Sequence, residues 1–187
     1  VTVPKQGDKK RIVELSIRNA KYFRQERFKQ IQIVDPDRHT KRIMSQMQKD
    51  LRLTEEPRHI ECFDNSNIQG SHPVAACVVF KNGKADKKEY RHYNIKTVEG
   101  PDDYASMEEV VHRRYKRLLE EGADLPQLIV IDGGKGQLSS ALKSLDLLGL
   151  RGKIAIIGIA KRLEEIYYPG DPIPLYLDKK YESLKIS

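Results

Sequence analysis

The chain has 187 residues, of which 33% are charged and 39% hydrophobic, and its formal net charge is +7. This length allows one sizeable core plus a flanking segment, and the composition is typical of a polar globular protein. No apolar run approaches the roughly 18 residues of a membrane span, so we expect a cytoplasmic protein without a membrane partner. Cys62 and Cys77 form no zinc-binding pair and are expected to be reduced, buried thiols.

The basic excess is confined to the leading part of the chain. Residues 1–56 contain 14 Lys and Arg against 8 Asp and Glu, whereas residues 57–187 contain 20 against 19. Apolar residues at helical spacing predict one helix over about 8–30, and a second from the Asp35-Pro36-Asp37 break to Leu51. We therefore predict a basic helical segment over 1–56 that leads into a domain over 57–187.

From Pro57 the pattern changes to alternating strands and helices. Strands are predicted over 59–64, 73–80, 89–96, 128–131 and 154–159, helices over 102–121 and 137–148, and a hairpin within 166–177. The order β-β-β-α-β-α-β predicts an α/β fold. Its mixed sheet has three leading antiparallel strands and then βαβ units flanked by helices, which is the order of RNase H-like folds. A doubly wound sheet would alternate strand and helix from its start.

Two carboxylates are placed where they could carry chemistry. Asp64 ends the first predicted strand and Asp132 ends the fourth, and these strands are neighbours in the RNase H-like order. Two facing carboxylates repel each other unless a proton or cation lies between them. Mg²⁺ or Mn²⁺ prefers such oxygen ligands and can activate water against a phosphodiester. The alternative is that each Asp only caps the turn that follows its strand.

The residues after Asp132 favour a phosphate contact more than a nucleotide site. The run Gly133-Gly134-Lys135-Gly136 lacks the spacing of a P-loop. A glycine turn before a helix can still present amides to phosphate, so Gly133, Gly134 and Lys135 are candidate contacts to a DNA backbone.

Three further features have both structural and functional interpretations. Asp102 and Asp103 begin a predicted helix, where capping is the expected role, although either could assist a metal ion. Arg91 and Lys96 lie in an aromatic and basic stretch typical of nucleic-acid surfaces. Alternation places Arg91 and Tyr93 on one face, so half of this stretch could instead belong to the core.

Several long phrases resemble one known family. IECFDNSNIQG, YNIKTVEGPDDYASMEEVVHRRY, LIVIDGGKGQLSSAL and IIGIAKRLEEIYYPG are similar to the nuclease half of UvrC, a component of the excinuclease ABC of bacterial nucleotide excision repair. The leading VPKQGDKKRIVELSIRNA also resembles that family, so the resemblance covers nearly the whole chain in order.

The resemblance implies an RNase H-like endonuclease that makes the incision 5′ to a lesion in damaged duplex DNA. It implies an Asp-Asp-His set holding one divalent ion, Mg²⁺ or Mn²⁺, with Asp64 and Asp132 as the aspartates and Asp102 or Asp103 as a candidate assistant. The family's histidine is expected beyond Ser187, so we expect a truncated nuclease with low or no activity. A UvrB-type helicase subunit is expected to bind regions outside this chain.

Two other functions remain open from the residues. The chain could be a non-catalytic RNase H-like module that binds DNA or protein, and metal-dependent stabilisation would distinguish this from a nuclease. It could also bind a small nucleotide through residues 133–136, which titration with nucleotides against short DNA would test.

Overall fold

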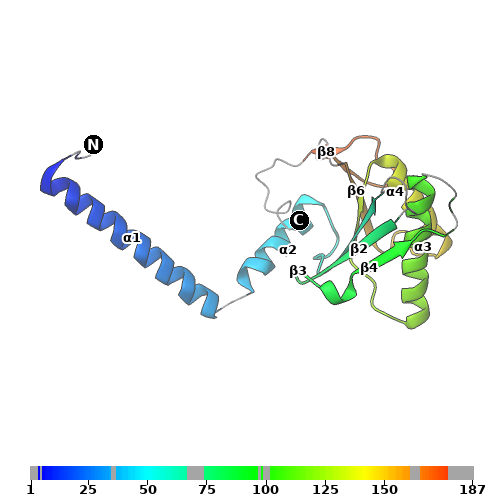
Figure 1. Cartoon of the computed structure of the whole chain (residues 1–187), viewed down its shortest axis with the longest axis horizontal. Helices are drawn as coiled ribbons and strands as arrows, with labels where there is room; N and C mark the ends of the chain where they lie inside the picture. The colour runs from blue at the N-terminus through cyan, green and yellow to red at the C-terminus, as the bar shows by residue number, and fades with distance from the viewer. Residues whose placement is uncertain are drawn as a thin grey trace. The chain divides into compact units, whose positions relative to one another are not determined.

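The structure is a computed structural model, and it describes residues 4, 6–34, 37–66, 74–96, 98, 102–160 and 165–176. The chain divides into two compact units, residues 1–42 and 43–187. Two helices lead the chain, α1 (Gly7–Val34) and α2 (Arg38–Asp50), as predicted (Figure 1). Residues 35 and 36 of the predicted break lie outside the described residues. The predicted domain boundary after residue 56 stays a prediction.

One mixed sheet forms the centre of the unit 43–187. Its strands are β1 (His59–Ser66), β2 (Val74–Lys81), β3 (Lys84–Ala85), β4 (Arg91–Asn94), β5 (Leu128–Asp132), β6 (Ala155–Ala160), β7 (Glu165–Tyr167) and β8 (Leu175–Tyr176). Among the described residues the strand order is β3-β2-β1-β5-β6-β7-β8, and β4 also pairs with β2. β1 is antiparallel to β2 and parallel to β5, and β5 is parallel to β6.

The predicted order of strands and helices is confirmed, with one correction at the third strand. Asn82 and Gly83 both have positive φ, 51° and 71°, as a two-residue hairpin turn requires. This turn leads into the short β3 and not directly into the predicted strand. Residues Lys87–Glu89 then form a 3₁₀ helix, so the strand predicted from residue 89 begins at Arg91. The predicted hairpin near the end of the chain is present as β7 and β8.

Helices α3 (Asp103–Glu121) and α4 (Lys135–Leu147) cover one face of the sheet (Figure 1). Helix α3 directs Met107, Val110, Val111 and Leu118 into the core, because positions three and four apart share one side of a helix. The last turns of α2 pack on the other face, where Met44, Met47 and Leu51 join Ile60 and Leu128 in a second cluster. No helix among the described residues has the length and hydrophobicity to cross a bilayer.

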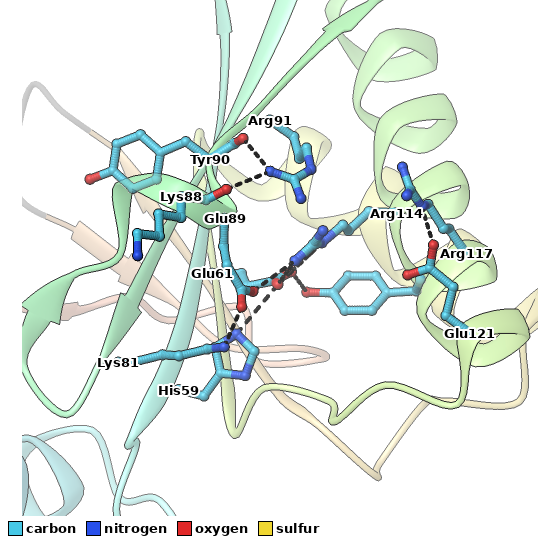
Figure 2. Close-up of polar contacts among 11 residues, drawn as sticks. His59, Glu61, Lys81, Lys88, Glu89, Tyr90, Arg91, Arg114, Arg117 and Glu121 are labelled. Atoms are coloured by element: carbon cyan, nitrogen blue, oxygen red, sulfur yellow. Dashed lines mark hydrogen bonds and ion pairs between the residues drawn. The ribbon is translucent and has the colours of Figure 1, made fainter.

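A buried ion pair joins β1 to α3. The carboxylate of Glu61 is fully buried and accepts hydrogen bonds from Arg114, at 2.5 Å from Nη2 and 3.2 Å from Nε. Tyr115 Oη donates to the same carboxylate at 2.9 Å. Figure 2 shows His59 and Glu89 beside the pair, with His59 Nε2 3.4 Å from Glu61 Oε1 and Glu89 Oε2 4.0 Å from Arg114 Nη2. The strand that carries Asp64 is thereby attached to the helix that begins at Asp103.

We expect Arg114→Met to destabilise the fold by about 3–5 kcal/mol, because it leaves the buried Glu61 carboxylate without its cation. Unfolding in urea, followed by near-ultraviolet circular dichroism, measures the loss. Arg117→Met is the matched control on the same helix, since Arg117 pairs with Glu121 in solvent and should change stability little. Equal stability of the two variants would contradict a structural role for the buried pair.

Stability should also depend on the ionisation of Glu61. Burial acts to raise the pKa of Glu61, but its contacts with His59, Arg114 and Tyr115 lower it, and the net pKa lies below the ordinary value of 4.5. Between the ordinary pKa and the lower folded-state pKa, Glu61 is therefore more often protonated in the unfolded state than in the folded state. The contribution of Glu61 is present above about pH 4.5 and is lost as the pH falls through the folded-state pKa. Urea titrations at decreasing pH should show a smaller loss in Glu61→Gln than in the unsubstituted chain.

Candidate active site

Asp64 and Asp132 lie side by side at one edge of the sheet. β1 and β5 are parallel, and the register pairs Phe63 with Ile131, so the next residue of each strand is one of the two acids. Side chains at equivalent positions of neighbouring parallel strands point to the same face, with backbones about 4.8 Å apart. The predicted neighbourhood of the two strands is therefore confirmed. The role of the two acids in binding metal stays a prediction.

The two acids project from the face opposite α3 and α4. Phe63 and Ile131 point into the core beneath those helices, so Asp64 and Asp132 point to the other side, together with Cys62 and Val130. Both carboxylates are half-buried. Burial, and then the negative charge of Asp132, raises the pKa of the Cys62 thiol to about 12, so this thiol stays protonated at neutral pH.

Glycines hold the turn that follows Asp132 close to β6. The Gly133 amide donates to the Ile159 carbonyl at 3.0 Å, extending the pairing of β5 and β6 by one residue. A Cβ at Gly158 would lie 2.9 Å from the Gly133 carbonyl oxygen and 3.3 Å from Cβ of Leu138, so only glycine allows this approach. The position of Asp132 thus depends on a close backbone contact between two strands.

Asp102 and Asp103 have different environments at the start of α3. Oδ1 of Asp102 accepts the amides of Tyr104 and Ala105, both at 3.0 Å, as expected of a helix N-cap. Asp103 is exposed, and its backbone carbonyl accepts a hydrogen bond from Asn65 Nδ2 at 2.9 Å. The residue after Asp64 is therefore linked directly to the beginning of α3.

Gly134 and Lys135 begin α4, on the same edge of the sheet. Gly134 is the N-cap residue, and no side chain caps this helix there. Lys135 Nζ donates to the Pro172 carbonyl at 2.5 Å and lies 5.4 Å from the centre of the Tyr167 ring. The cation predicted to contact DNA thus also attaches the β7–β8 hairpin to the helix.

The structure places Arg91 on the sheet face opposite the carboxylate pair, and Lys96 after the end of β4. Arg91 is paired in register with Cys77, on the α3 side of the sheet, and its guanidinium donates to the carbonyls of Lys88 and Tyr90 (Figure 2). Asp64 points to the opposite face. The exposed Lys96 follows β4, and its amide donates to Glu109 of α3 at 3.1 Å.

Tyr93 lies on the α3 side like Arg91, as strand alternation predicts. Its ring packs half-buried on the core and lies 5.4 Å below the guanidinium of Arg113. Tyr93 is therefore packed against the core, whereas Arg91 on the same face is half-buried and bonded to local carbonyls.

The two carboxylates at the sheet edge are the type of ligand that a hard divalent cation prefers, but they are few. Within the described residues, no group of three or more His, Cys, Asp or Glu side chains is arranged to hold a metal ion. Asp64 and Asp132 supply carboxylate oxygens, which Mg²⁺ and Mn²⁺ prefer, and such ions commonly complete their shells with water and phosphate oxygens. The two aspartates fit such an ion as a partial set of ligands.

Two residues that position this site were not singled out in the sequence. Asn65 directly follows Asp64. Its short amide side chain next to a candidate acid could have indicated a hydrogen bond that holds the site. Gly158 interrupts the apolar run of β6, and a glycine inside a strand often marks a close backbone approach.

Comparison with known protein families identifies the chain. The sequence model of the UvrC RNase H endonuclease domain matches residues 48–186. The chain belongs to the UvrC RNase H endonuclease domain family. The RNase H-like fold predicted from the order of strands and helices is thereby confirmed.

Relatives in the UvrC family extend the match over the whole chain. The UvrABC system protein C of Christiangramia forsetii is 78% identical over 186 residues, which is 100% of this chain and 31% of that protein. That of Porphyromonas gingivalis W83 is 57% identical over 185 residues, 99% of this chain and 31% of that protein. The chain thus spans about a third of the length of these relatives.

Among solved structures, the chain is similar to Ciona intestinalis endonuclease V in complex with a 24mer DNA containing an inosine followed by a ribo-adenosine. The TM-score is 0.42 and the sequence identity 19%, and the match covers 65% of this chain and 52% of that chain.

We expect Gly158→Ala to destabilise the unit 43–187 by about 1–3 kcal/mol, because the added methyl group forces β6 away from the Gly133 carbonyl. Gly134→Ala is the control, since a Cβ there meets no heavy atom within 4 Å. Urea unfolding midpoints of the two variants measure the difference. A Gly158→Ala midpoint equal to that of the control would show that the close approach does not constrain the turn.

Proposed function

We propose that this chain is the catalytic core of a DNA endonuclease in which Asp64 and Asp132 hold one divalent ion, Mg²⁺ or Mn²⁺. The observation that carries the proposal is the shared register of the two acids on one sheet face, in a member of an endonuclease family. Carboxylates on adjacent strands can repel each other, and a cation between them would relieve the repulsion.

The bound ion would neutralise charge that develops on the phosphodiester and lower the pKa of a water molecule. The protein would hold the two aspartates in place. The Gly133–β6 contact orients Asp132, and the Asn65 amide holds the chain next to Asp64 against α3. Asp102 Oδ1 caps α3, and Asp102 or Asp103 is proposed as an assisting acid.

Phosphate contacts are proposed at the beginning of α4. Gly133 and Gly134 bring backbone close to the carboxylate edge, and Lys135 adds positive charge there. Lys96 is exposed and could contact DNA farther from the carboxylates. Arg91 is the weakest candidate, because its guanidinium is bound to local carbonyls on the opposite side of the sheet.

For the longer protein we propose incision 5′ to a lesion in nucleotide excision repair. The support is the similarity to proteins named UvrABC system protein C, whose name places them in a three-component system. The proposed partners are damaged duplex DNA and a UvrB-type helicase subunit that binds outside this chain. A non-catalytic RNase H-like module that binds DNA or protein is the alternative function that the metal experiment addresses.

We expect Mn²⁺ to raise the thermal unfolding midpoint of the chain, because an ion that binds only the folded state stabilises it. Asp64→Asn and Asp132→Asn should each remove this shift, whereas Asp124→Asn, in an exposed loop, should retain it. Differential scanning calorimetry with and without Mn²⁺ measures the effect.

In the longer protein, the same two substitutions should abolish the 5′ incision while leaving the fold intact. Incision of a labelled, lesion-containing duplex measures this. Retained 5′ cutting in either variant would refute the catalytic assignment, and a folded chain without any Mn²⁺ shift would favour the binding module.

A further inference from the structure

We propose that Tyr104 is a stacking platform for an unpaired nucleobase of DNA bound beside Asp64 and Asp132. This inference rests on the proposed function, because it assumes that DNA occupies that edge of the sheet. It adds a contact to a base, whereas the proposed function involves only the phosphodiester backbone and the metal.

The first observation is the position of the Tyr104 ring. Tyr104 lies in the first turn of α3 and is 58% exposed. Its ring nevertheless rests on the backbone of Gly136, in the first turn of α4. A Cβ built at Gly136 would lie 2.8 Å from Cζ and 2.9 Å from Oη of Tyr104, and closer still to Cε1. The ring therefore packs against a residue that has no side chain.

The second observation is that the residues around Tyr104 and Gly136 adjoin, along the chain or through one hydrogen bond, the residues that follow Asp64 and Asp132. Asp102 Oδ1 accepts the Tyr104 amide at 3.0 Å, and Asn65 Nδ2 donates to the neighbouring Asp103 carbonyl at 2.9 Å. Asn65 directly follows Asp64. On the other side Gly136 lies four residues after Asp132, in the helix that the Gly133 turn begins. Tyr104 therefore lies on a helix start that is bonded to the residue after Asp64, and its ring contacts the helix that follows Asp132.

The third observation is the groove around the ring. An open, mainly polar groove is lined by Tyr104 with Asp102, Asp103, Lys135 and Gln137. A single exposed aromatic residue is common on protein surfaces and by itself indicates nothing. Here the ring lines a hollow that runs past the beginning of α4, where phosphate contacts are proposed. Lys135 supplies positive charge in the same groove.

These features favour a nucleobase as the ligand. Every base presents a π face, so an exposed aromatic ring held by a neighbouring helix can stack on it whatever the sequence. The bases of an intact duplex are stacked on each other, so the ring would select DNA whose strand is unpaired or distorted next to the cleaved bond. Tyr104 would thus be a positioning residue that favours locally opened DNA.

The test uses the 187-residue chain and single-stranded 12-nucleotide DNA that carries one 2-aminopurine, placed at successive positions. Without added Mn²⁺ or Mg²⁺, binding should quench 2-aminopurine at one or two positions through stacking. Tyr104→Phe should retain the quenching. Tyr104→Ala should lose it and weaken binding roughly 5- to 100-fold. Leu119→Ala, an exposed residue near the other end of α3, is the matched control and should bind normally.

Gly136→Ala provides a second variant, in which Tyr104 itself is not substituted. Its methyl group would displace the ring, so quenching should fall although Tyr104 is present. Quenching that persists in Tyr104→Ala, or a loss of binding equal in Leu119→Ala, would overturn the proposal.

An Asp64→Asn chain separates this proposal from the proposed function. It should retain the quenching while losing the Mn²⁺ shift. If the unsubstituted chain shows the Mn²⁺ shift and binds DNA without any quenching that depends on Tyr104, only the stacking proposal fails. If it shows neither the Mn²⁺ shift nor DNA binding, the proposed function fails and the stacking proposal fails with it.

Discussion

The parallel pairing of β1 with β5 is the constraint on which the candidate site depends. Side chains alternate along a strand, so a shift of one residue in this register would turn one acid toward the helices and leave the other on the opposite face. The apolar residues before the acids hold the register. Phe63, Ile129 and Ile131 are fully buried beneath α3 and α4, while Ile60 and Leu128 are buried on the other face. Core packing therefore aligns Asp64 with Asp132.

The buried polar cluster has a related role on the side of the helices. Arg114 and Tyr115 donate hydrogen bonds to the buried Glu61 carboxylate, and these bonds join the middle of β1 to α3. Replacing a buried ion pair by apolar residues often changes stability little, so such pairs are more informative about position than about stability. In this fold the pair helps to orient α3, whose first residues lie next to the carboxylate edge through Asn65.

Charges of both signs meet at that edge. The N-termini of α3 and α4 carry partial positive charge there, close to the acids on β1 and β5. Asp102 caps α3, whereas α4 begins at a glycine that has no capping side chain. Lys135 bonds to the Pro172 carbonyl and so connects the β7–β8 hairpin to α4.

The sequence by itself determined the order of the strands and helices, the two acids at strand ends and the neighbourhood of the strands that bear them. These features follow from local periodicity, the Asn82-Gly83 turn and the chain order of a known fold class. The largest change of order was at the third strand, where the Asn82-Gly83 turn leads into a short strand and a 3₁₀ helix that the polar residues 84–89 did not indicate.

Only the tertiary structure decided how side chains distant in sequence meet. Glu61 and Arg114 are 53 residues apart, and Lys135 and Pro172 are 37 apart. The distinction between Asp102 as a cap and Asp103 as an exposed acid, and the placement of Tyr104 on Gly136, likewise depend on the rotation of each helix about its axis. That rotation is set by the packing of whole faces against the sheet, and a local pattern of residues does not contain it.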